Sequence, residues 1–321
     1  MTDMSNSPIG KSLLRREDKR FLTGNGQYTD DVVMPGQTYG VFVRSPHAHA
    51  RINAIDTSRA LAAPGVVAIF TGADLAEAKV GGLPCGWLIH SKDGSPMKEP
   101  PHPVLAQGKA RHVGDQVALV VAESLLQAKD AAEMVDVDYE PLPAVVDTAT
   151  ADTAGTPVHD EVPDNVCYDW GHGDKAAVDA AFEKAAHVTR IELVNNRLIP
   201  NAIEPRAANA VYQRHDDSYT LYVANQNPHV ERLLMSAFVL GLPESKVRVI
   251  APDVGGGFGS KIFLYPEETA LVWASKRVGR PIKWTAERSE SFLTDAHGRD
   301  HVTEVRLAFD KDNRMTGLKV D

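Results

Sequence analysis

The chain has 321 residues, of which 43% are hydrophobic and 24% are charged, a composition typical of globular proteins. Its formal net charge of −9 argues against a general nucleic-acid binder, because such binding depends on clustered Lys and Arg that neutralise phosphates. No apolar run approaches the roughly 18 residues of a membrane helix. We therefore expect a cytoplasmic protein of about two domains.

The two cysteines, Cys85 and Cys167, lie far apart in the sequence. Two thiols cannot form a four-cysteine zinc site or hold an iron–sulfur cluster by themselves. If the chemistry of this protein requires electron transfer, we expect the relay to lie on another polypeptide.

The first half of the chain predicts an α+β domain. Ser124, with Gln127 three residues later, predicts a capped helix that runs through Glu133. The residues from 81 to 103, rich in Pro and Gly, predict a long surface loop, and the polar stretch from 147 to 165 is typical of a linker. Apolar runs predict strands at 39–43, 66–70, 117–122 and 135–139. We place the first domain at 16–147 and a linker at 148–164.

The second half, 165–321, alternates strands and helices in the manner of an α/β domain. Asp174 predicts the cap of a helix over 175–186. Asn227 and Pro228 predict the start of a helix that Gly241 ends. The remaining pattern predicts a helix at 266–277 and strands at 188–198, 207–212, 219–224, 247–250, 282–285, 302–309 and 315–320. Because the last strand reaches the end of the chain, we expect either another segment to pair with it or the chain to be the front part of a longer one.

The most unusual local sequence is Asp253-Val-Gly-Gly-Gly-Phe-Gly-Ser-Lys261. It fits neither nucleotide-binding fingerprint, since Ser260 occupies the last glycine position of G-x-G-x-x-G and separates Gly259 from Lys261. The segment is either a tight turn or a close approach of backbone to a ligand. Phe258 favours the ligand, because a turn tip usually carries Asn, Asp or Ser.

A second candidate segment is Ala224-Asn-Gln-Asn-Pro-His229, at the junction of a predicted strand and helix. Gln226 either offers its amide to an oxo or phosphate ligand there, or caps the helix with Asn227. His229 is interpreted as a surface histidine. Because the two segments are one βαβ unit apart, we expect them to meet at one edge of a sheet, where α/β proteins commonly bind ligands.

Glu204 and Arg206 interrupt the strand pattern between residues 195 and 206. They form either a surface ion pair or part of the lining of the same cavity. Arg288, with its neighbouring glutamates, is interpreted as a solvated helix start, and His47 and His49 as loop residues.

At these residues the sequence resembles the molybdopterin-binding large subunit of the xanthine oxidase family, and within it the large chain of aerobic carbon monoxide dehydrogenase. The resemblance covers nearly the whole chain. Segments beginning at Arg44, Asp56, Pro64, Val113 and Asp138 resemble its a/b hammerhead domain. Those beginning at Asn225, Asp253 and Gly279 resemble the start of its molybdopterin-binding domain.

The resemblance implies a molybdenum hydroxylase that oxidises an aldehyde, an N-heteroaromatic carbon or carbon monoxide with water as the oxygen source. It implies that Gln226 hydrogen-bonds an oxo ligand of molybdenum, and that Gly256, Gly257, Phe258 and Gly259 line the cofactor, a molybdopterin in its cytosine dinucleotide form. It also implies an iron–sulfur small subunit with [2Fe–2S] clusters, a medium subunit with FAD, and a C-terminal remainder of the large subunit.

Two departures limit what the resemblance implies. Purine-oxidising members carry Glu directly after the lysine of the glycine motif, and here that position is Ile262, which makes a purine substrate less expected. The base glutamate of the family, and the copper-binding cysteine of its carbon monoxide oxidisers, lie further toward the C-terminus than Asp321. The catalytic residue is therefore unknown, and we expect this chain to be inactive by itself.

Two alternatives remain open from the sequence. The chain is either an enzyme part or a catalytically silent assembly module, and the coding region downstream of Asp321 discriminates these. A nucleotide-binding enzyme is a weaker alternative that a binding assay with NAD or ATP tests.

Overall fold

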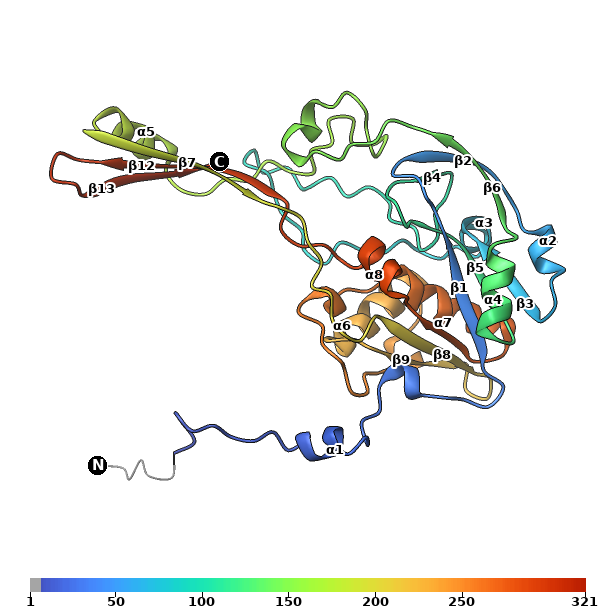
Figure 1. The fold of residues 1–321 in the computed structure, drawn as a ribbon. Helices are drawn as coiled ribbons and strands as arrows, with labels where there is room; N and C mark the ends of the chain where they lie inside the picture. Colours follow the sequence, from blue (N-terminus) through green and yellow to red (C-terminus); the bar gives the residue numbers. More distant parts are fainter. Residues whose placement is uncertain (1–6) are drawn as a thin grey trace.

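The computed structural model describes residues 7–321. A rounded body carries a long β-arm on one side, and the N-terminal segment extends away from its base (Figure 1). The helices are α1 Asp18–Leu22, α2 Ser58–Leu61, α3 Gly72–Glu77, α4 Leu125–Ala132, α5 Lys175–Glu183, α6 Pro228–Leu233, α7 Pro266–Val278 and α8 Arg288–Thr294, with a π-helical turn η4 Leu234–Leu240 and short 3-10 turns η2 Thr29–Asp31, η3 Thr148–Thr153, η5 Glu244–Lys246 and η6 Ser260–Ile262. The strands are β1 Thr38–Arg44, β2 Ala50–Asp56, β3 Val66–Thr71, β4 Lys109–Ala110, β5 Gln116–Ala122, β6 Asp136–Pro141, β7 His187–Asn195, β8 Ala207–Gln213, β9 Ser218–Val223, β10 Val247–Ile250, β11 Ile282–Thr285, β12 His301–Phe309 and β13 Met315–Val320.

A seven-stranded sheet in the order β10-β9-β8-β11-β1-β5-β3 forms the centre of the body. The pairs β9–β10 and β1–β11 are parallel, and the other neighbours are antiparallel. The sheet takes strands from both halves of the chain and joins them where Thr38 pairs with Ile282. The two domains expected from the sequence are therefore successive segments of the chain that contribute strands to one common sheet.

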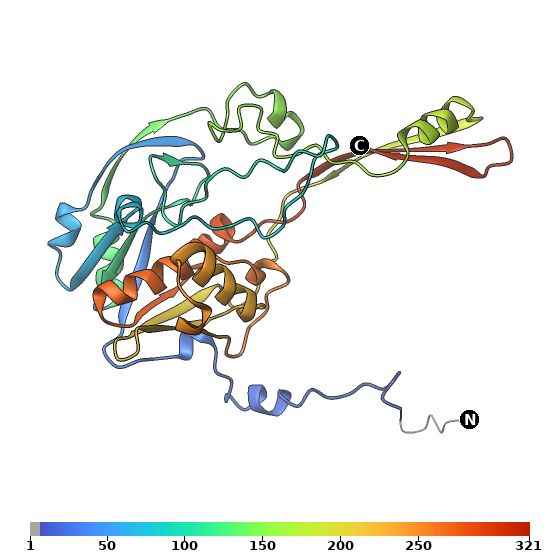
Figure 2. The same cartoon turned by 180° about the vertical axis from the view of Figure 1, so that it is seen from behind.

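The main core lies between this sheet and helices α6 and α7, which stand in front of the strands in Figure 2. Strand β5 is buried along its whole length because both faces are covered. Leu119 and Val121 belong to the main core, while Val120 packs on the opposite face with residues of α2 and α4. A continuous apolar run, rather than an alternating one, is what such a doubly covered strand requires.

Two three-stranded sheets complete the fold. Strands β4, β2 and β6 form one sheet, and β13, β12 and β7 form the arm, with α5 packed on one face of it. Strand β13 pairs with β12 in antiparallel register, so the last predicted strand has a partner along one edge. Among residues 7–321, no helix is both long enough and apolar enough to span a bilayer.

Most predicted elements are confirmed within two or three residues, including 247–250, 282–285 and 315–320 without change. The loop from 81 to 103 contains no regular element among the described residues. Two elements end three residues earlier than predicted, strand β7 at Asn195 and the helix after Asp174 at Glu183. His49 lies in a loop, as interpreted, but its side chain is buried, with Nδ1 2.9 Å from the carbonyl oxygen of Pro143. Strand β2 was missed because its charged and polar residues give no apolar run.

Candidate functional site

The parallel pairing of β9 and β10 determines where the two candidate segments lie. Residues Tyr219 to Tyr222 pair in register with Val247 to Ile250. The carboxyl ends of parallel neighbours meet at the same edge of a sheet. The segment with Gln226 follows β9, and the glycine-rich loop follows β10, so both leave the sheet at this edge.

Gln226 contacts the glycine-rich loop directly, as the sequence predicts. Its Oε1 accepts a hydrogen bond from the Gly259 amide at 3.0 Å, and its own backbone N–H donates to the Lys261 carbonyl at 2.8 Å. A Cβ atom at Gly257 would lie 2.4 Å from Gln226 Oε1, so only glycine allows this approach. The alternative that Gln226 caps the helix is wrong; instead, the Asn225 side chain accepts from the Asn227 N–H.

The loop backbone leaves donors free at its tip. Gly256, Phe258 and Gly259 have φ of 97°, 52° and 98°, in the left-handed region. Among residues 7–321, the amides of Gly256, Gly257 and Phe258 donate to no protein acceptor. Successive amides in such a conformation form a concave anion-binding backbone. The ring of Phe258 lies over Gly256, with 75% of the residue exposed, and Gly259 faces open space.

Glu204 holds the first glycine of this loop. Its Oε2 accepts from the Gly255 amide at 2.6 Å and from Lys261 Nζ at 2.8 Å. Lys261 is buried, and burial lowers the pKa of its ammonium, an effect that the Glu204 ion pair partly offsets. Glu204 thus pairs with Lys261, and the expected ion pair between Glu204 and Arg206 does not form.

Arg206 lies behind the site, at 1% exposure, in a network of buried charges. It donates to Glu267 through Nη1 at 2.8 Å and to Asp295 through Nε at 2.7 Å. Its guanidinium also stacks on Tyr265, with 3.8 Å from Cζ to the ring centroid. The surface interpretation of Arg206 was wrong, because its partners come from α7 and from the residue after α8, far away in sequence.

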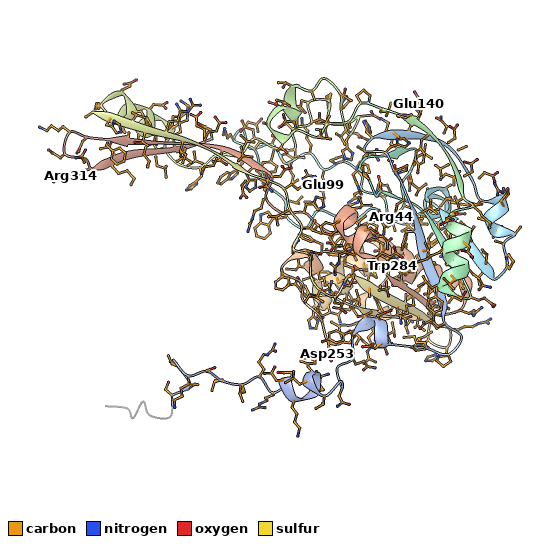
Figure 3. All side chains as sticks on the ribbon, in the orientation of Figure 1. Arg44, Glu99, Glu140, Asp253, Trp284 and Arg314 are labelled. Atoms are coloured by element: carbon orange, nitrogen blue, oxygen red, sulfur yellow. The ribbon has the colours of Figure 1, made fainter. Side chains whose placement is uncertain are left out.

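The N-terminal segment fixes the start of the loop, a contact that the sequence did not predict. Arg20 pairs with both oxygens of Asp253, whose backbone N–H donates to the Gln27 carbonyl at 2.9 Å. Figure 3 labels Asp253 at the base of the body, next to the N-terminal segment. The Arg20 hydrogen bond, followed by that from the Gln27 amide, lowers the pKa of Asp253. No local pattern marks a contact that spans more than 200 residues of chain.

The remaining candidates surround the same loop. Arg288 begins helix α8, as expected, but its side chain is not free in solvent: it donates to the carbonyls of Ala202 at 2.8 Å and Ile203 at 2.7 Å, and so supports the chain before Glu204. Ile262 is partly exposed beyond Lys261, and His229 is exposed. Within residues 7–321, neither side chain has a hydrogen bond that assigns it a role.

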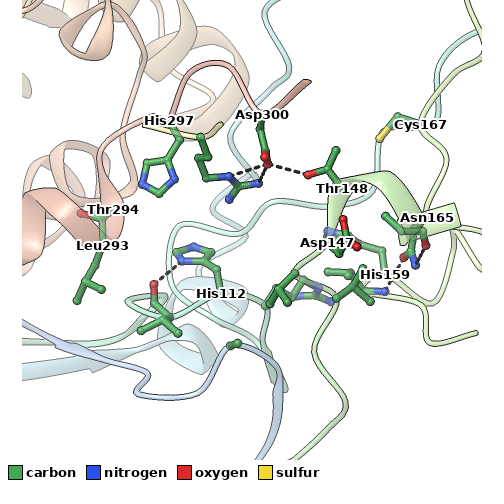
Figure 4. Close-up of a pocket in the computed structure, with 18 of the residues that line it drawn as sticks. His112, Asp147, Thr148, His159, Asn165, Cys167, Leu293, Thr294, His297 and Asp300 are labelled. Atoms are coloured by element: carbon green, nitrogen blue, oxygen red, sulfur yellow. Dashed lines mark hydrogen bonds and ion pairs between the residues drawn. The ribbon is translucent and has the colours of Figure 1, made fainter. Parts of the chain in front are cut away.

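A cavity of about 890 Å³ lies elsewhere, between the arm, the residues after α8 and the linker turn η3 (Figure 4). Its wall contains an ion pair between Arg197 and Asp300, and Thr148 donates to the same carboxylate at 2.8 Å. No residue of the glycine loop lines it. The cavity therefore does not coincide with the place where the free donors gather.

The donors at the sheet edge suit a ligand rich in oxygen. The Nε2 amide of Gln226 has no acceptor in the described part of the chain, and the buried Nδ2 of Asn225 has none either. These amides and the three free backbone N–H groups can donate hydrogen bonds to the oxygens of oxo groups and phosphates. Within residues 7–321, no three His, Cys, Asp or Glu side chains converge as a metal site.

Two family models and several known proteins match most of this chain. Residues 23–143 match the a/b hammerhead domain of aldehyde oxidase and xanthine dehydrogenase, and residues 158–321 match a molybdopterin cofactor-binding domain. The nicotine 6-hydroxylase large subunit of Paenarthrobacter nicotinovorans is 38% identical over 97% of this chain and 37% of its own length.

Two further relatives show the same coverage. The carbon monoxide dehydrogenase large chain of Afipia carboxidovorans is 38% identical over 97% of this chain and 39% of its own. The crystal structure of quinoline 2-oxidoreductase from Pseudomonas putida 86 superposes with a TM-score of 0.86 at 38% identity, over 97% of this chain and 39% of that one. The chain thus spans about two fifths of the length of these relatives.

Proposed function

Because this chain belongs to the aldehyde oxidase and xanthine dehydrogenase family of molybdenum hydroxylases, we propose that it forms the first part of a molybdopterin-binding large subunit. The complete enzyme would oxidise an aldehyde, an N-heteroaromatic carbon or carbon monoxide, with water as the source of oxygen. A silent assembly module is the disfavoured alternative, since the relatives named above are enzyme subunits.

The observation that supports the proposal is the convergence of free donors on the loop that follows β10. Gln226 Nε2 would donate to an oxo ligand of molybdenum, and Gly256, Gly257 and Gly259 would bring backbone against the cofactor. Phe258, exposed and held by left-handed backbone, would pack beside the metal and the pterin. Donors fixed in advance stabilise negative charge on oxygen without reorganisation during the reaction.

The bound cofactor would supply two-electron oxidation chemistry, and this part of the chain would supply its orientation. Glu204 and Lys261 hold the glycine loop from behind, so that its amides keep their directions. No proton-transfer role is assigned to a residue described here; the base glutamate would lie in the polypeptide beyond Asp321.

We extend the proposal to the assembly. The cofactor would be the cytosine dinucleotide form of molybdopterin, and the partners would be an iron–sulfur subunit with [2Fe–2S] clusters, an FAD subunit and the remainder of the large subunit. The enzyme would be cytoplasmic. The hammerhead domain would span 16–147, the linker 148–164 and the first part of the molybdopterin-binding domain 165–321.

Ile262 bears on the choice of substrate. An aliphatic side chain next to Lys261 offers no carboxylate to a purine, so the proposal favours a small carbonyl compound, a heteroaromatic ring or carbon monoxide. Dye-linked oxidation assays with these three substrate classes would separate them.

Metal analysis tests the proposed function. The chain would be purified with and without the polypeptide that corresponds to the remaining length of its relatives. We expect molybdenum to copurify only with the completed form, and Gln226→Ala to reduce its activity by roughly a hundredfold or more, the effect of removing one donor from such a site.

Gln213→Ala provides the matched control for the loss of a glutamine side chain. Gln213 is the last residue of β8, and its side chain forms no hydrogen bond within residues 7–321. A completed enzyme that contains no molybdenum would refute the proposal. Equal activity of the two variants would refute the role of Gln226.

A further inference from the structure

The arm formed by strands β7, β12 and β13 has two faces of different chemistry. Its register decides which side chains share a face, because successive side chains along a strand point to opposite sides. Ala308 pairs with Gly317 on one neighbouring strand and with Val188 on the other. A Cβ atom at Gly317 would lie 3.2 Å from the side chain of Ala181 and 3.3 Å from that of Phe182, both on α5. The face that contains Val188, Ala308 and Gly317 is therefore the α5 face.

Every Asp, Glu, Lys and Arg of the three strands lies on this α5 face. Arg190 pairs in register with Arg306, and Arg306 pairs with Lys319. Glu192 pairs in register with Glu304. These positions are an even number of residues from those that face α5. Ion pairs agree with the register, since Glu304 pairs with Arg190 and lies 2.9 Å from Arg306 Nε.

The opposite face carries no Asp, Glu, Lys or Arg. Two aliphatic side chains from each strand form its centre, and we call these six residues the open face: Ile191, Leu193, Val305, Leu307, Leu318 and Val320. The four on the outer strands are between 47% and 56% exposed. None of the six belongs to either hydrophobic core of the described chain.

This distribution is the reverse of what a sheet in water requires. An antiparallel sheet with one solvated face presents its polar residues to water and its apolar residues to a core. In the arm, the charges lie on the side of α5, and the aliphatic side chains lie on the side that no described element covers. Contiguous apolar surface of this kind marks a contact with other polypeptide.

We propose that the open face is the docking surface for the remainder of the large subunit, which packs an apolar segment against these six side chains. The inference rests on the proposed function, because that function requires the remaining polypeptide. The matched region is 37% of one relative and 39% of another, so most of the length of each relative lies outside it. The docking segment would bring no unpaired charge to this face, because burying a charge without a partner is costly.

The position of β13 favours this occupant over a second copy of the chain. Strand β13 supplies two of the six side chains and ends one residue before Asp321, at the root of the arm (Figure 1). In a longer polypeptide, the segment after Asp321 would begin beside the open face. A tethered segment acts at an effective concentration of about millimolar, whereas a second copy has no such advantage.

The outer edge of β13 gives the same segment a backbone partner. In the part of the chain that the structure describes, β13 pairs with β12 alone. Such an edge presents unpaired N–H and C=O groups that an added strand can satisfy. A segment that lies along this edge would therefore meet both hydrogen-bonding groups and apolar side chains.

Cysteine labelling measures the exposure of single positions on the arm. Ile191→Cys and Leu318→Cys place a thiol on the open face, and the control Val188→Cys places one on the α5 face at a similar exposure. Each variant is made in the 321-residue chain and in the completed large subunit, and then reacted with a maleimide. Mass spectrometry of the peptide that carries the new thiol separates its labelling from that of the exposed Cys85 and Cys167.

In the 321-residue chain, we expect all three thiols to react. In the completed subunit, we expect labelling at Ile191→Cys and Leu318→Cys to slow at least about tenfold, and labelling at Val188→Cys to change less than about twofold. Two probes on different strands keep the test valid if one variant fails to fold.

Unchanged labelling on the open face of the completed subunit would overturn the inference, and so would equal slowing at Val188→Cys. Slowing in the 321-residue chain by itself, if it increases with protein concentration, would identify a second copy as the occupant and would also overturn it. Labelling requires no molybdenum. A completed subunit that protects the open face but contains no metal would therefore refute the proposed function alone.

Discussion

Replacing Glu267 by Gln should destabilise the fold more than removing the charge of Glu140, Lys261 or Asp253. Glu267 is 0% exposed and lies at the centre of the buried network. Its Oε1 accepts from Arg44 at 2.9 Å, Gln116 at 2.8 Å and Arg206 at 3.2 Å, and its Oε2 accepts from Arg206 at 2.8 Å. Figure 3 shows Arg44 in the body of the molecule, above Trp284.

The structure sets a lower bound for the effect. In the less damaging orientation, the Gln amide nitrogen replaces Oε2, loses the bond from Arg206 Nη1 and places a donor against a donor. Charge-assisted hydrogen bonds contribute about 1.5–3 kcal/mol each, and removing one partner of a buried ion pair costs about 3–5 kcal/mol. We therefore expect the free energy of unfolding to fall by about 3–5 kcal/mol at neutral pH.

Chemical denaturation followed by tryptophan fluorescence measures this loss, since the Trp284 ring centroid lies 5.2 Å from the Arg206 guanidinium carbon. Glu140→Gln is the control: its ion pair with Arg51 is exposed and should contribute less than about 1 kcal/mol. Burial tends to raise the pKa of Glu267, but the charges of Arg206 and Arg44 outweigh burial and hold it well below its usual range. The difference between the two variants should shrink as the pH falls below about 4, where the unfolded carboxylate becomes protonated. A loss below about 1 kcal/mol for Glu267→Gln would refute the reasoning.

Three further predictions concern the loop after β10. Gly257→Ala should displace Gln226, because the added Cβ would lie 2.4 Å from its Oε1, and should lower the free energy of unfolding by about 1–3 kcal/mol. Gly86→Ala, whose Cβ meets nothing within 4 Å, should not lower it, and equal free energies of unfolding for the two variants would contradict the steric argument. Lys261→Met should leave a carboxylate without its cation and cost about 2–4 kcal/mol in thermal unfolding, with an unchanged melting temperature as the contrary result. Asp253→Asn should remove the ion pair with Arg20 and increase the rate of proteolysis near α1. Acidification of the unsubstituted chain should have the same effect, since the pKa of Asp253 is lowered and its ion pair is lost as the pH falls. Equal cleavage rates for the variant and the unsubstituted chain would count against this contact.

The sequence was sufficient to predict the convergence of Gln226 and the glycine loop. Gln226 follows one predicted strand, the glycine loop follows the next, and a helix connects the two strands; such a unit places its strands in parallel, as β9 and β10 are. The glycine run likewise indicated a close approach of the backbone to another group, and the structure shows one between Gly257 and the Gln226 side chain. These predictions depend on local chain geometry, which a sequence records directly.

The contacts that hold the site from behind could not be read in this way. Arg206 looks like a surface residue among Asn, Glu and Pro, and its burial depends on Glu267 and Asp295, 61 and 89 residues further along. The contact between Arg20 and Asp253 spans 233 residues. A periodic pattern reports which face of an element is buried, but not which distant charge meets it there.

The parallel seam between β1 and β11 has a consequence for gene recombination within this family. Thr38 and Tyr39 pair with Ile282 and Lys283, and the Thr38 amide donates to the Pro281 carbonyl at 2.8 Å. A crossover between the codons for residues 143 and 158 would inherit the two sides of this seam from different parents. Chimeras made there should therefore tolerate sequence divergence less well than those made after β11, which inherit both sides of the seam from one parent.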